Sequence, residues 1–149
     1  MAKEIERKFL VISSSYRALA SSSFRIRQGY LSTNPASTVR VRTKGDHGYI
    51  TVKGITSGAT RNEWEYEIPL KDAEEMLKLT EEGTVIDKTR FIVGRWEVDE
   101  FHGHLDGLVV AEIELTDENE SFGLPDFIGR EVTGDARYYN SVLAANGRP

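Results

Sequence analysis

The amino-acid sequence predicts a mainly β protein of the α+β class, with about eight antiparallel strands closed or nearly closed into a barrel-shaped tunnel and with helices packed outside. Three observations lead to this prediction. Hydrophobic and polar residues alternate with a period of two along most of the chain. Turn-forming stretches such as "STNPAS" and "HGHLDG" separate the alternating segments. The charged residues are sorted by sign from one segment to the next.

Length and composition are those of one domain, for which we expect residues 1–149. The 149 residues are 39% hydrophobic and 29% charged, enough for a sizeable core. No long apolar run and no signal-like start are present, so we expect a soluble cytoplasmic protein without a membrane partner. The absence of cysteine excludes disulfides, thiolate metal sites and thiol nucleophiles. The net charge of −5 argues against general nucleic-acid binding but says nothing of a basic cavity inside.

Alternation predicts the strands in order along the chain. The predicted strands are residues 3–11, 23–33, 37–45, 47–54, 61–69, 84–94, 95–101 and 108–116. The connections between several of them are short and rich in turn formers, as in "KGDHG" between the third and fourth. Such spacing favours hairpins and therefore an antiparallel sheet.

Three stretches have helical patterns instead. In "KDAEEMLKLTEEG" the apolar residues lie near one face behind Asp72 as a possible cap, and Gly83 can end the helix. The stretch "DENESFG" predicts a single turn. In "GDARYYNSVLAANG" Asp135 is the predicted cap and Gly147 follows the last turn.

The first strand raises the functional question. In "EIERKF" the side chains of Glu4, Glu6 and Lys8 lie on one face of an extended chain, with Ile5 and Phe9 on the other. A strand with its charged row in water would show the same alternation, so alternation alone does not decide. The polar rows, however, are acidic at the start of the first strand and in the fifth and eighth strands, and basic in the second, third and sixth. Rows sorted in this way indicate a polar side that faces inward, with opposite charges sharing a lumen.

Charges that face inward need a ligand or dense pairing to offset their desolvation. A polyphosphate with a divalent metal meets this need, because arginine and lysine bind phosphate oxygens and carboxylates bind Mg²⁺ or Mn²⁺. The candidate phosphate-binding residues are Arg25, Arg27, Arg40, Arg42, Lys53, Lys88 and Arg90, with Arg137 near the tunnel mouth. The candidate metal ligands are Glu4, Glu6, Glu112 and Glu114.

These residues resemble a known family. "EIERKF" is similar to the ExExK motif at the start of CYTH domains, also called triphosphate tunnel metalloenzymes. The stretches "RVR", "VKG", "NEWEYEI", "KTR", "WEVDEF" and "AEIEL" follow in the order and spacing of that family. The resemblance covers nearly the whole chain and implies a tunnel that binds triphosphate compounds with a divalent metal. It adds Glu63 to the metal-site candidates and matches Lys8 to the motif lysine.

The resemblance also suggests a general base, formed by Tyr30 with Lys8 or Lys53 as its partner. Tyr30 is out of phase with Arg25 and Arg27 unless Gly29 forms a bulge. The predicted catalytic residues are therefore Lys8, Tyr30 and Lys53.

The short length and the stretch "RQGYL" look most like the short bacterial members that hydrolyse inorganic triphosphate to pyrophosphate and phosphate. The alternatives are a class IV adenylate cyclase, a hydrolase of ATP or thiamine triphosphate, and a non-catalytic polyphosphate-binding module. The intact acidic row favours an enzyme, and no motif identifies the base pocket that a cyclase needs. We expect a small-molecule triphosphate as substrate and a monomer or homodimer.

Overall fold

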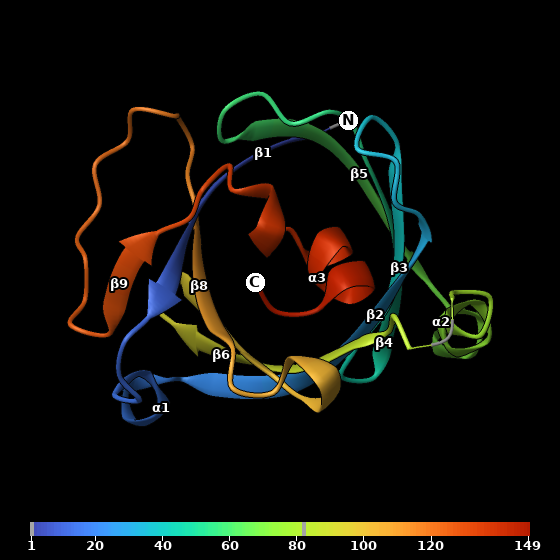
Figure 1. Cartoon of the computed structure of the whole chain (residues 1–149), viewed down its shortest axis with the longest axis horizontal. Helices are drawn as coiled ribbons and strands as arrows, with labels where there is room; N and C mark the ends of the chain where they lie inside the picture. Colours follow the sequence, from blue (N-terminus) through green and yellow to red (C-terminus); the bar gives the residue numbers. More distant parts are fainter. Residues whose placement is uncertain (1, 82) are drawn as a thin grey trace.

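The computed structural model describes residues 2–81 and 83–149, which form a closed antiparallel barrel (Figure 1). Its strands are β1 (Ala2–Val11), β2 (Ser22–Ser32), β3 (Thr38–Lys44), β4 (His47–Lys53), β5 (Thr60–Ile68), β6 (Ile86–Val93), β7 (Trp96–Phe101), β8 (Val109–Glu114) and β9 (Ile128–Glu131). They pair in the order β5-β4-β3-β2-β6-β7-β8-β1-β9, and β1 also pairs with β5, which closes the ring. The predicted eight-stranded antiparallel barrel is thus confirmed, with β9 added beside β1.

The first eight strands begin and end within two residues of the predicted bounds. β9 was not predicted, because its four residues are too few for a clear alternation. It pairs only with the end of β1, where Phe9 lies opposite Glu131 and Val11 opposite Ile128.

The helices are α1 (Tyr16–Leu19), α2 (Leu70–Leu77) and α3 (Asn140–Asn146), with 3₁₀ turns η1 (Gly103–Leu105) and η2 (Ala136–Tyr138). The helix prediction from residue 71 to Gly83 was too long, because α2 ends at Leu77. Asp72 lies in its first turn rather than at its cap, which is Pro69. Within the described residues no helix has the length and hydrophobicity that crossing a membrane would require.

The two other helical predictions fared differently. "DENESFG" forms a turn closed by the amide of Glu120 donating to the carbonyl of Asp117, and no helix. Asp135 does act as a cap, but for η2, where its carboxylate accepts from the amide of Arg137. α3 ends at Gly147, whose φ of 79° lies in the left-handed region that glycine tolerates.

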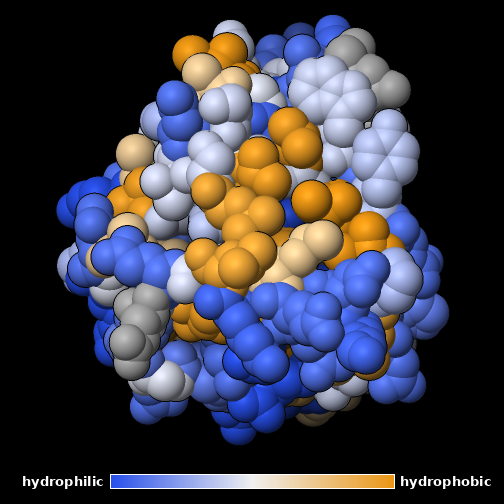
Figure 2. Space-filling view, turned by 90° about the vertical axis from the view of Figure 1, so that its right-hand side faces the viewer, coloured by the Kyte–Doolittle hydropathy of each residue, from blue (hydrophilic) through white to orange (hydrophobic). Residues whose placement is uncertain are grey.

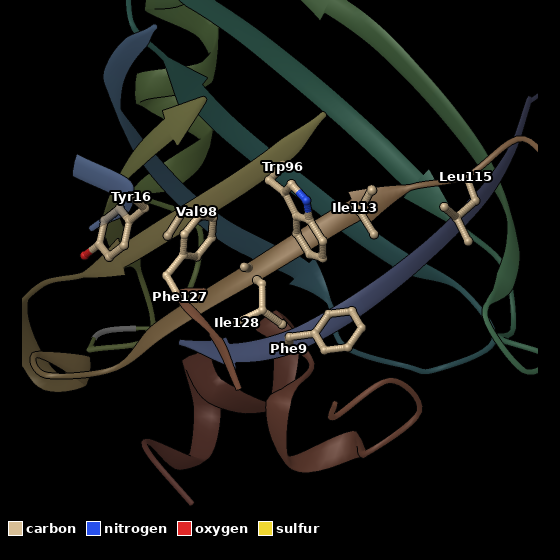
Figure 3. Packing of buried hydrophobic residues seen from close by; sticks show 9 residues of the cluster. Phe9, Tyr16, Trp96, Val98, Ile113, Leu115, Phe127 and Ile128 are labelled. Atoms are coloured by element: carbon tan, nitrogen blue, oxygen red, sulfur yellow. The ribbon is translucent and has the colours of Figure 1, made fainter. Parts of the chain in front are cut away.

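One hydrophobic core lies outside the barrel wall, over β1, β7 and β8 (Figure 3). Phe9 of β1 and Trp96 of β7 pack edge to face, with ring centroids 5.5 Å apart. Tyr16 of α1 and Phe127, from the segment before β9, complete this cluster and meet edge to face. The outward apolar rows of these strands are therefore covered by other parts of the chain.

α2 covers a second outer region, over β3 and β4. Val41 of β3 packs with Ala73 and Leu77 of the helix, and all three are buried. Gly48 of β4 allows this close approach, because a Cβ atom there would lie 2.7 Å from the Cβ of Ala73.

α3 occupies a different place from the other two helices, because in the view along the barrel axis it lies within the ring of strands (Figure 1). Its Leu143 packs with Ile86, Phe101 and Val110. These three residues share the phase of the inward charges on β6, β7 and β8. One end of the barrel interior is therefore apolar and covered by α3, so the expected packing of helices outside the barrel applies to α1 and α2 only.

Candidate functional site

The strand register places the charged rows on the inner wall of the barrel. Residues directly opposite each other on neighbouring strands point to the same side of a sheet. The opposed inward pairs are Glu6 and Glu114, Lys8 and Glu112, Tyr30 and Arg40, Gln28 and Arg42, Lys53 and Glu63, and Arg90 and Asp99. Cross-strand pairing thus brings carboxylates from four strands and cations from four strands onto the inner wall of the barrel.

A cavity opens among these side chains. Its lining includes six of the predicted site residues, namely Glu4, Glu6, Lys8, Tyr30, Arg40 and Lys53. The loop between β4 and β5 and the segment from Val132 to Ser141 complete the lining. Acidic, basic and phenolic groups therefore meet in one concave site, as in many active sites.

Two lysines in this cavity are paired with carboxylates. The ammonium of Lys53 donates to both carboxylate oxygens of Glu4, at 2.9 Å each. The ammonium of Lys8 lies 3.5 Å from Glu112 and donates to the carbonyl of Tyr138 at 2.9 Å. Burial alone would raise the pKa of Glu112, but Lys8 and the nearby arginine outweigh it and hold that pKa at about 2. Glu112 is therefore ionised at neutral pH.

The arginines of β3 are crowded and incompletely paired. Arg40 and Arg42 share a single carboxylate, that of Glu65, at 3.3 and 3.2 Å. The buried Nε atoms of both arginines have no hydrogen-bond partner within the protein. Burial and the neighbouring guanidiniums of Arg40 and Arg90 lower the pKa of Arg42 to about 10. Such a pair of cations suits an anion with several oxygens.

The carboxylates on the inner wall repel one another, as the arginines of β3 do. Burial and the nearby charges of Glu112 and Glu4 raise the pKa of Glu6 well above its usual value. Burial and the charge of Glu4 likewise raise the pKa values of Glu63 and Glu114. A cluster of hard oxygen donors that repel one another fits a divalent cation such as Mg²⁺ or Mn²⁺. Among the described residues, however, no three such side chains are already placed to hold an ion.

A second cluster of charges is buried and satisfied. The ammonium of Lys88 lies 2.7 Å from Asp99, and the guanidinium of Arg90 binds the same carboxylate at 2.8 and 3.0 Å. Arg90 also reaches Glu97 at 3.2 Å. Burial by itself would raise the pKa of Asp99, but Arg90 and Lys88 hold it well below the usual range. We call Lys88, Arg90, Glu97 and Asp99 the Asp99 cluster. Lys88 and Arg90 do not line the cavity, and neither do Arg42, Glu63, Glu112 and Glu114, which lie behind or beside its lining residues.

The phase of β2 differs from the prediction. Gln28 and Tyr30 point inward together, and the irregularity in pairing lies between Tyr30 and Ser32 rather than at Gly29. Consequently Arg25 and Arg27 are exposed on the outer face. Arg25 binds Asp87 there through two hydrogen bonds of 2.6 and 2.7 Å. The structure therefore brings neither arginine into the cavity.

Arg137 is also away from the cavity. Its side chain is 62% exposed and pairs with Asp135 at 2.7 Å. It is absent from the cavity lining, although Tyr139, two residues further on, contributes to it.

Arg61 of β5 lines the cavity and was missed from the sequence. Its guanidinium donates to the carbonyl of Gly54 at 3.0 and 2.9 Å and to Thr38 at 3.3 Å, which ties the ends of β3, β4 and β5 together. The parity of Arg61 with Glu63 was the signal that could have found it. The lining residues Asn140 and Ser141 carried no such signal, because they lie outside the strands.

Comparison with known proteins agrees with this geometry. The profile of the CYTH domain matches residues 2–139. The chain belongs to the CYTH domain family. The family resemblance expected from the sequence is confirmed over nearly the whole chain.

Two curated relatives within this family are of similar length. The chain is 51% identical to the inorganic triphosphatase of Acetivibrio thermocellus, with 98% of this chain and 96% of the relative covered. It is 38% identical to the inorganic triphosphatase of Nitrosomonas europaea, with 95% and 96% covered.

Solved CYTH-like structures share the fold. The crystal structure of an inorganic triphosphatase is 33% identical, with a TM-score of 0.67 and coverage of 98% of this chain and 100% of that chain. A Hippeastrum protein, described as a putative adenylyl cyclase with a dominant triphosphatase activity, has a TM-score of 0.57. At 16% identity over 76% of this chain and 80% of that chain, it supports the tunnel fold alone.

Proposed function

We propose that the protein hydrolyses inorganic triphosphate to pyrophosphate and phosphate in the barrel cavity, with a divalent metal ion. The observation that carries this proposal is the crowded arginine pair Arg40 and Arg42, with unpartnered Nε atoms, beside a row of mutually repelling carboxylates. The names of the two curated relatives support the same substrate. We further expect a cytoplasmic location and no nucleic-acid partner, because the chain lacks cysteine and has a net charge of −5.

Substrate binding rests on the cations of the cavity. Arg40 and Arg42 would donate charge-assisted hydrogen bonds to the oxygens of a phosphate group, whose negative charge would offset the burial and the repulsion that lower the pKa of Arg42. The two arginine residues are only 7% and 8% exposed, so they have little contact with water. In such surroundings a phosphate that both guanidiniums bind would be held more strongly than in water. Lys8 and Lys53 supply further donors from β1 and β4.

Binding requires an exchange of partners. Lys53 holds Glu4 and Lys8 holds Glu112, so these carboxylates are engaged before substrate arrives. When phosphate oxygens bind the two lysine ammonium groups, the ion pairs with Glu4 and Glu112 would break. The two carboxylates could then bind Mg²⁺ or Mn²⁺. We therefore assign Glu4, Glu6, Glu63, Glu112 and Glu114 to the metal ion and expect metal and triphosphate to strengthen each other's binding.

The chemistry is a phosphoanhydride hydrolysis. A divalent ion held by these carboxylates would supply charge neutralisation at the phosphate oxygens and would favour ionisation of the attacking water. The protein's own part is to orient the chain of phosphates and to stabilise the negative charge on the leaving pyrophosphate through the arginines and lysines. The substrate would thus be recognised through its phosphate groups, by cationic side chains on several strands of the barrel.

Tyr30 fits a donor better than a base. Burial raises the pKa of Tyr30 despite the opposing effect of Arg40 and Lys8, so its hydroxyl stays protonated at neutral pH. Its oxygen accepts a hydrogen bond from Gln28 at 3.3 Å. We therefore assign Tyr30 to hydrogen bonding with a phosphate oxygen, in place of the general-base role that the sequence suggested.

A direct comparison of substrates tests the proposal. Inorganic triphosphate, ATP and thiamine triphosphate are incubated with Mg²⁺ and with Mn²⁺, and the products are separated. We expect kcat/KM to be highest for inorganic triphosphate, with pyrophosphate and phosphate as products. Formation of cyclic AMP from ATP at a higher rate would replace this proposal by a cyclase, and binding without turnover of any substrate would indicate a binding module.

A further inference from the structure

Gln28 of β2 is a buried polar residue that has no part in the chemistry described so far. It is 0% exposed and points inward, but it does not line the cavity. Its amide nitrogen donates to the hydroxyl oxygen of Tyr30 at 3.3 Å. Its amide oxygen has no hydrogen-bond partner among the described residues. A buried acceptor without a partner is costly and uncommon in folded proteins, so it suggests a role in binding.

The residue directly opposite Gln28 on β3 is Arg42. Opposed residues on neighbouring antiparallel strands have Cβ atoms about 5 Å apart, on the same side of the sheet. The Nε atom of Arg42 is a buried donor, and it too lacks a partner within residues 2–81 and 83–149. An acceptor and a donor without partners thus belong to neighbouring side chains.

The other neighbours of Gln28 in the sheet give its amide no partner. On β6 the opposed residue is Ile86, whose side chain is apolar and buried. The outward residues of β3, Val39 and Val41, are apolar as well. Figure 2, which views the barrel from the side of β3 and β4, shows hydrophobic residues gathered in the middle of this outer face. The amide of Gln28 and the Nε atom of Arg42 are therefore expected to find their partners inside the barrel.

The charge of Arg42 determines which way the amide of Gln28 points. With its oxygen toward Arg42, the amide presents an acceptor to a cation. The reverse orientation would place the amide NH₂ group against the guanidinium, so that donors would face donors. The amide nitrogen therefore points to Tyr30, as its hydrogen bond to the hydroxyl shows.

This hydrogen bond also orients the hydroxyl of Tyr30. The ring of Tyr30 packs against the apolar cluster that includes Leu143 of α3, which holds the ring in place. Because the hydroxyl oxygen accepts from Gln28, its own O–H is left to donate in another direction. Tyr30 lines the cavity, where a phosphate oxygen would accept that hydrogen bond.

We propose that Gln28 is a positioning residue of the triphosphate site, which orients Tyr30 through its amide nitrogen and Arg42 through its amide oxygen. When Arg42 binds a phosphate, its Nε–H donates to the amide oxygen of Gln28, and its two terminal nitrogens face the phosphate oxygens. Gln28 does not line the cavity, so it acts through these two neighbours. This role rests on the proposed function, because the anion that Arg42 binds is taken to be inorganic triphosphate.

Gln28→Met tests this role, because methionine has a similar volume but lacks the donor and the strong acceptor of the amide. The dissociation constant for inorganic triphosphate, measured by calorimetry without divalent metal, should rise roughly tenfold. The melting temperature without ligand should stay level or rise, because a buried oxygen without a partner is removed. A lower melting temperature with unchanged affinity would make Gln28 a structural residue and overturn the proposal.

A double-mutant cycle separates positioning from a general loss of structure. Tyr30→Phe removes the hydroxyl that Gln28 orients, so Gln28→Met should weaken triphosphate binding less in the Tyr30→Phe background than in the wild type. Equal losses of affinity in the two backgrounds would overturn the link between Gln28 and Tyr30.

Gln28→Glu is a second variant that keeps the shape of the side chain. Its carboxylate would bind Arg42 in place of phosphate and repel the substrate, so affinity should fall further than in Gln28→Met. Arg27→Met is the matched control and should bind as the wild type does, because Arg27 adjoins Gln28 on the exposed face of β2. Wild-type affinity in both Gln28 variants would overturn the proposal.

Hydrolysis of inorganic triphosphate with Mg²⁺ is measured on the same proteins, to separate the role of Gln28 from the proposed function. A wild type that binds inorganic triphosphate without hydrolysing it would overturn the proposed function, and the affinities of the variants would still decide the role of Gln28. A wild type that does not bind inorganic triphosphate would overturn both.

Discussion

Two groups of buried charged side chains in the barrel contain the same residue types but differ in how completely the charges are paired. In the Asp99 cluster, one carboxylate accepts from both Lys88 and Arg90 at 3.0 Å or less. In the other group, Arg40, which lines the cavity, and the neighbouring Arg42 share Glu65 at more than 3.0 Å and keep buried donors without partners. The first group is complete without a ligand and the second is not. Inward charge therefore indicates a binding site only where the charges remain unsatisfied.

The largest expected effect is on stability, in the complete cluster. Asp99→Asn leaves Lys88 and Arg90 buried without their shared anion, because Asp99 is only 2% exposed. We expect a loss of about 3–5 kcal/mol in the free energy of unfolding, measured by urea denaturation. Unchanged stability would mean that this cluster is open to solvent or counter-ions, and the contrast with the cavity would disappear.

In contrast to Asp99→Asn, Arg40→Ala should weaken substrate binding without lowering the free energy of unfolding. Removing one of two crowded guanidiniums relieves the repulsion felt by Arg42, so stability should stay level or rise. Losing a charged phosphate contact should lower kcat/KM for inorganic triphosphate by roughly ten- to a hundredfold. Arg27→Ala is the control, because Arg27 is exposed on the outer face and should leave both quantities unchanged.

Exchange of partners predicts opposite effects of two variants on metal binding. Glu4→Gln removes a carboxylate oxygen and should weaken Mn²⁺ binding, measured by calorimetry without phosphate, by at least about tenfold. Lys53→Gln should instead strengthen Mn²⁺ binding, because it frees the Glu4 carboxylate that Lys53 now holds. Glu74→Gln, on the exposed side of α2, should have no effect. Weaker Mn²⁺ binding in Lys53→Gln would contradict the exchange.

The smallest effect concerns pH and metal-free stability. Glu6 has a folded-state pKa above its unfolded value, so its charge destabilises the fold at neutral pH and this penalty is lost as pH falls through the folded pKa. In chelator, Glu6→Gln should therefore melt roughly 2–4 °C above the wild type at pH 7 and show no advantage in acid.

Glu112 provides the opposite case for the same measurement. Its folded pKa of about 2 lies below the unfolded value, so its stabilisation is present above the unfolded pKa and is lost as pH falls toward 2. Glu112→Gln should therefore melt below the wild type at neutral pH. Equal shifts in both variants would show that the two carboxylates do not differ in their surroundings.

The strands were predictable because alternation of period two is a strong local signal, and closure followed from charges sorted by strand. The orientation of β2 could not be predicted, because Arg25 and Arg27 form a polar row that the sequence does not assign to the inner or outer wall. Pairing with Asp87 resolves it in the structure. The division between cavity and Asp99 cluster was also hidden, since Lys88 and Arg40 look alike until their partners on other strands are known.

The triple pairing of β1 bears on how the chain folds during synthesis. β1 pairs with β5 through Glu4 and its neighbours, with β8 from Glu6 onward and with β9 at its end. The amide of Val132 also donates to the carbonyl of Lys8. The hydrogen bonds of β1, the first strand to be synthesised, therefore cannot all form until β9, the last strand, has been made. Contacts between residues so distant in sequence form slowly.

During that wait β1 is an unpaired strand edge, which is a template for aggregation with other nascent chains. Its alternating charges oppose such pairing, because a flat stack of copies would place Glu4, Glu6 and Arg7 each beside its own like charge. Glu4 and Glu6, which we propose as metal ligands in the folded protein, would thus also oppose aggregation of the incomplete chain.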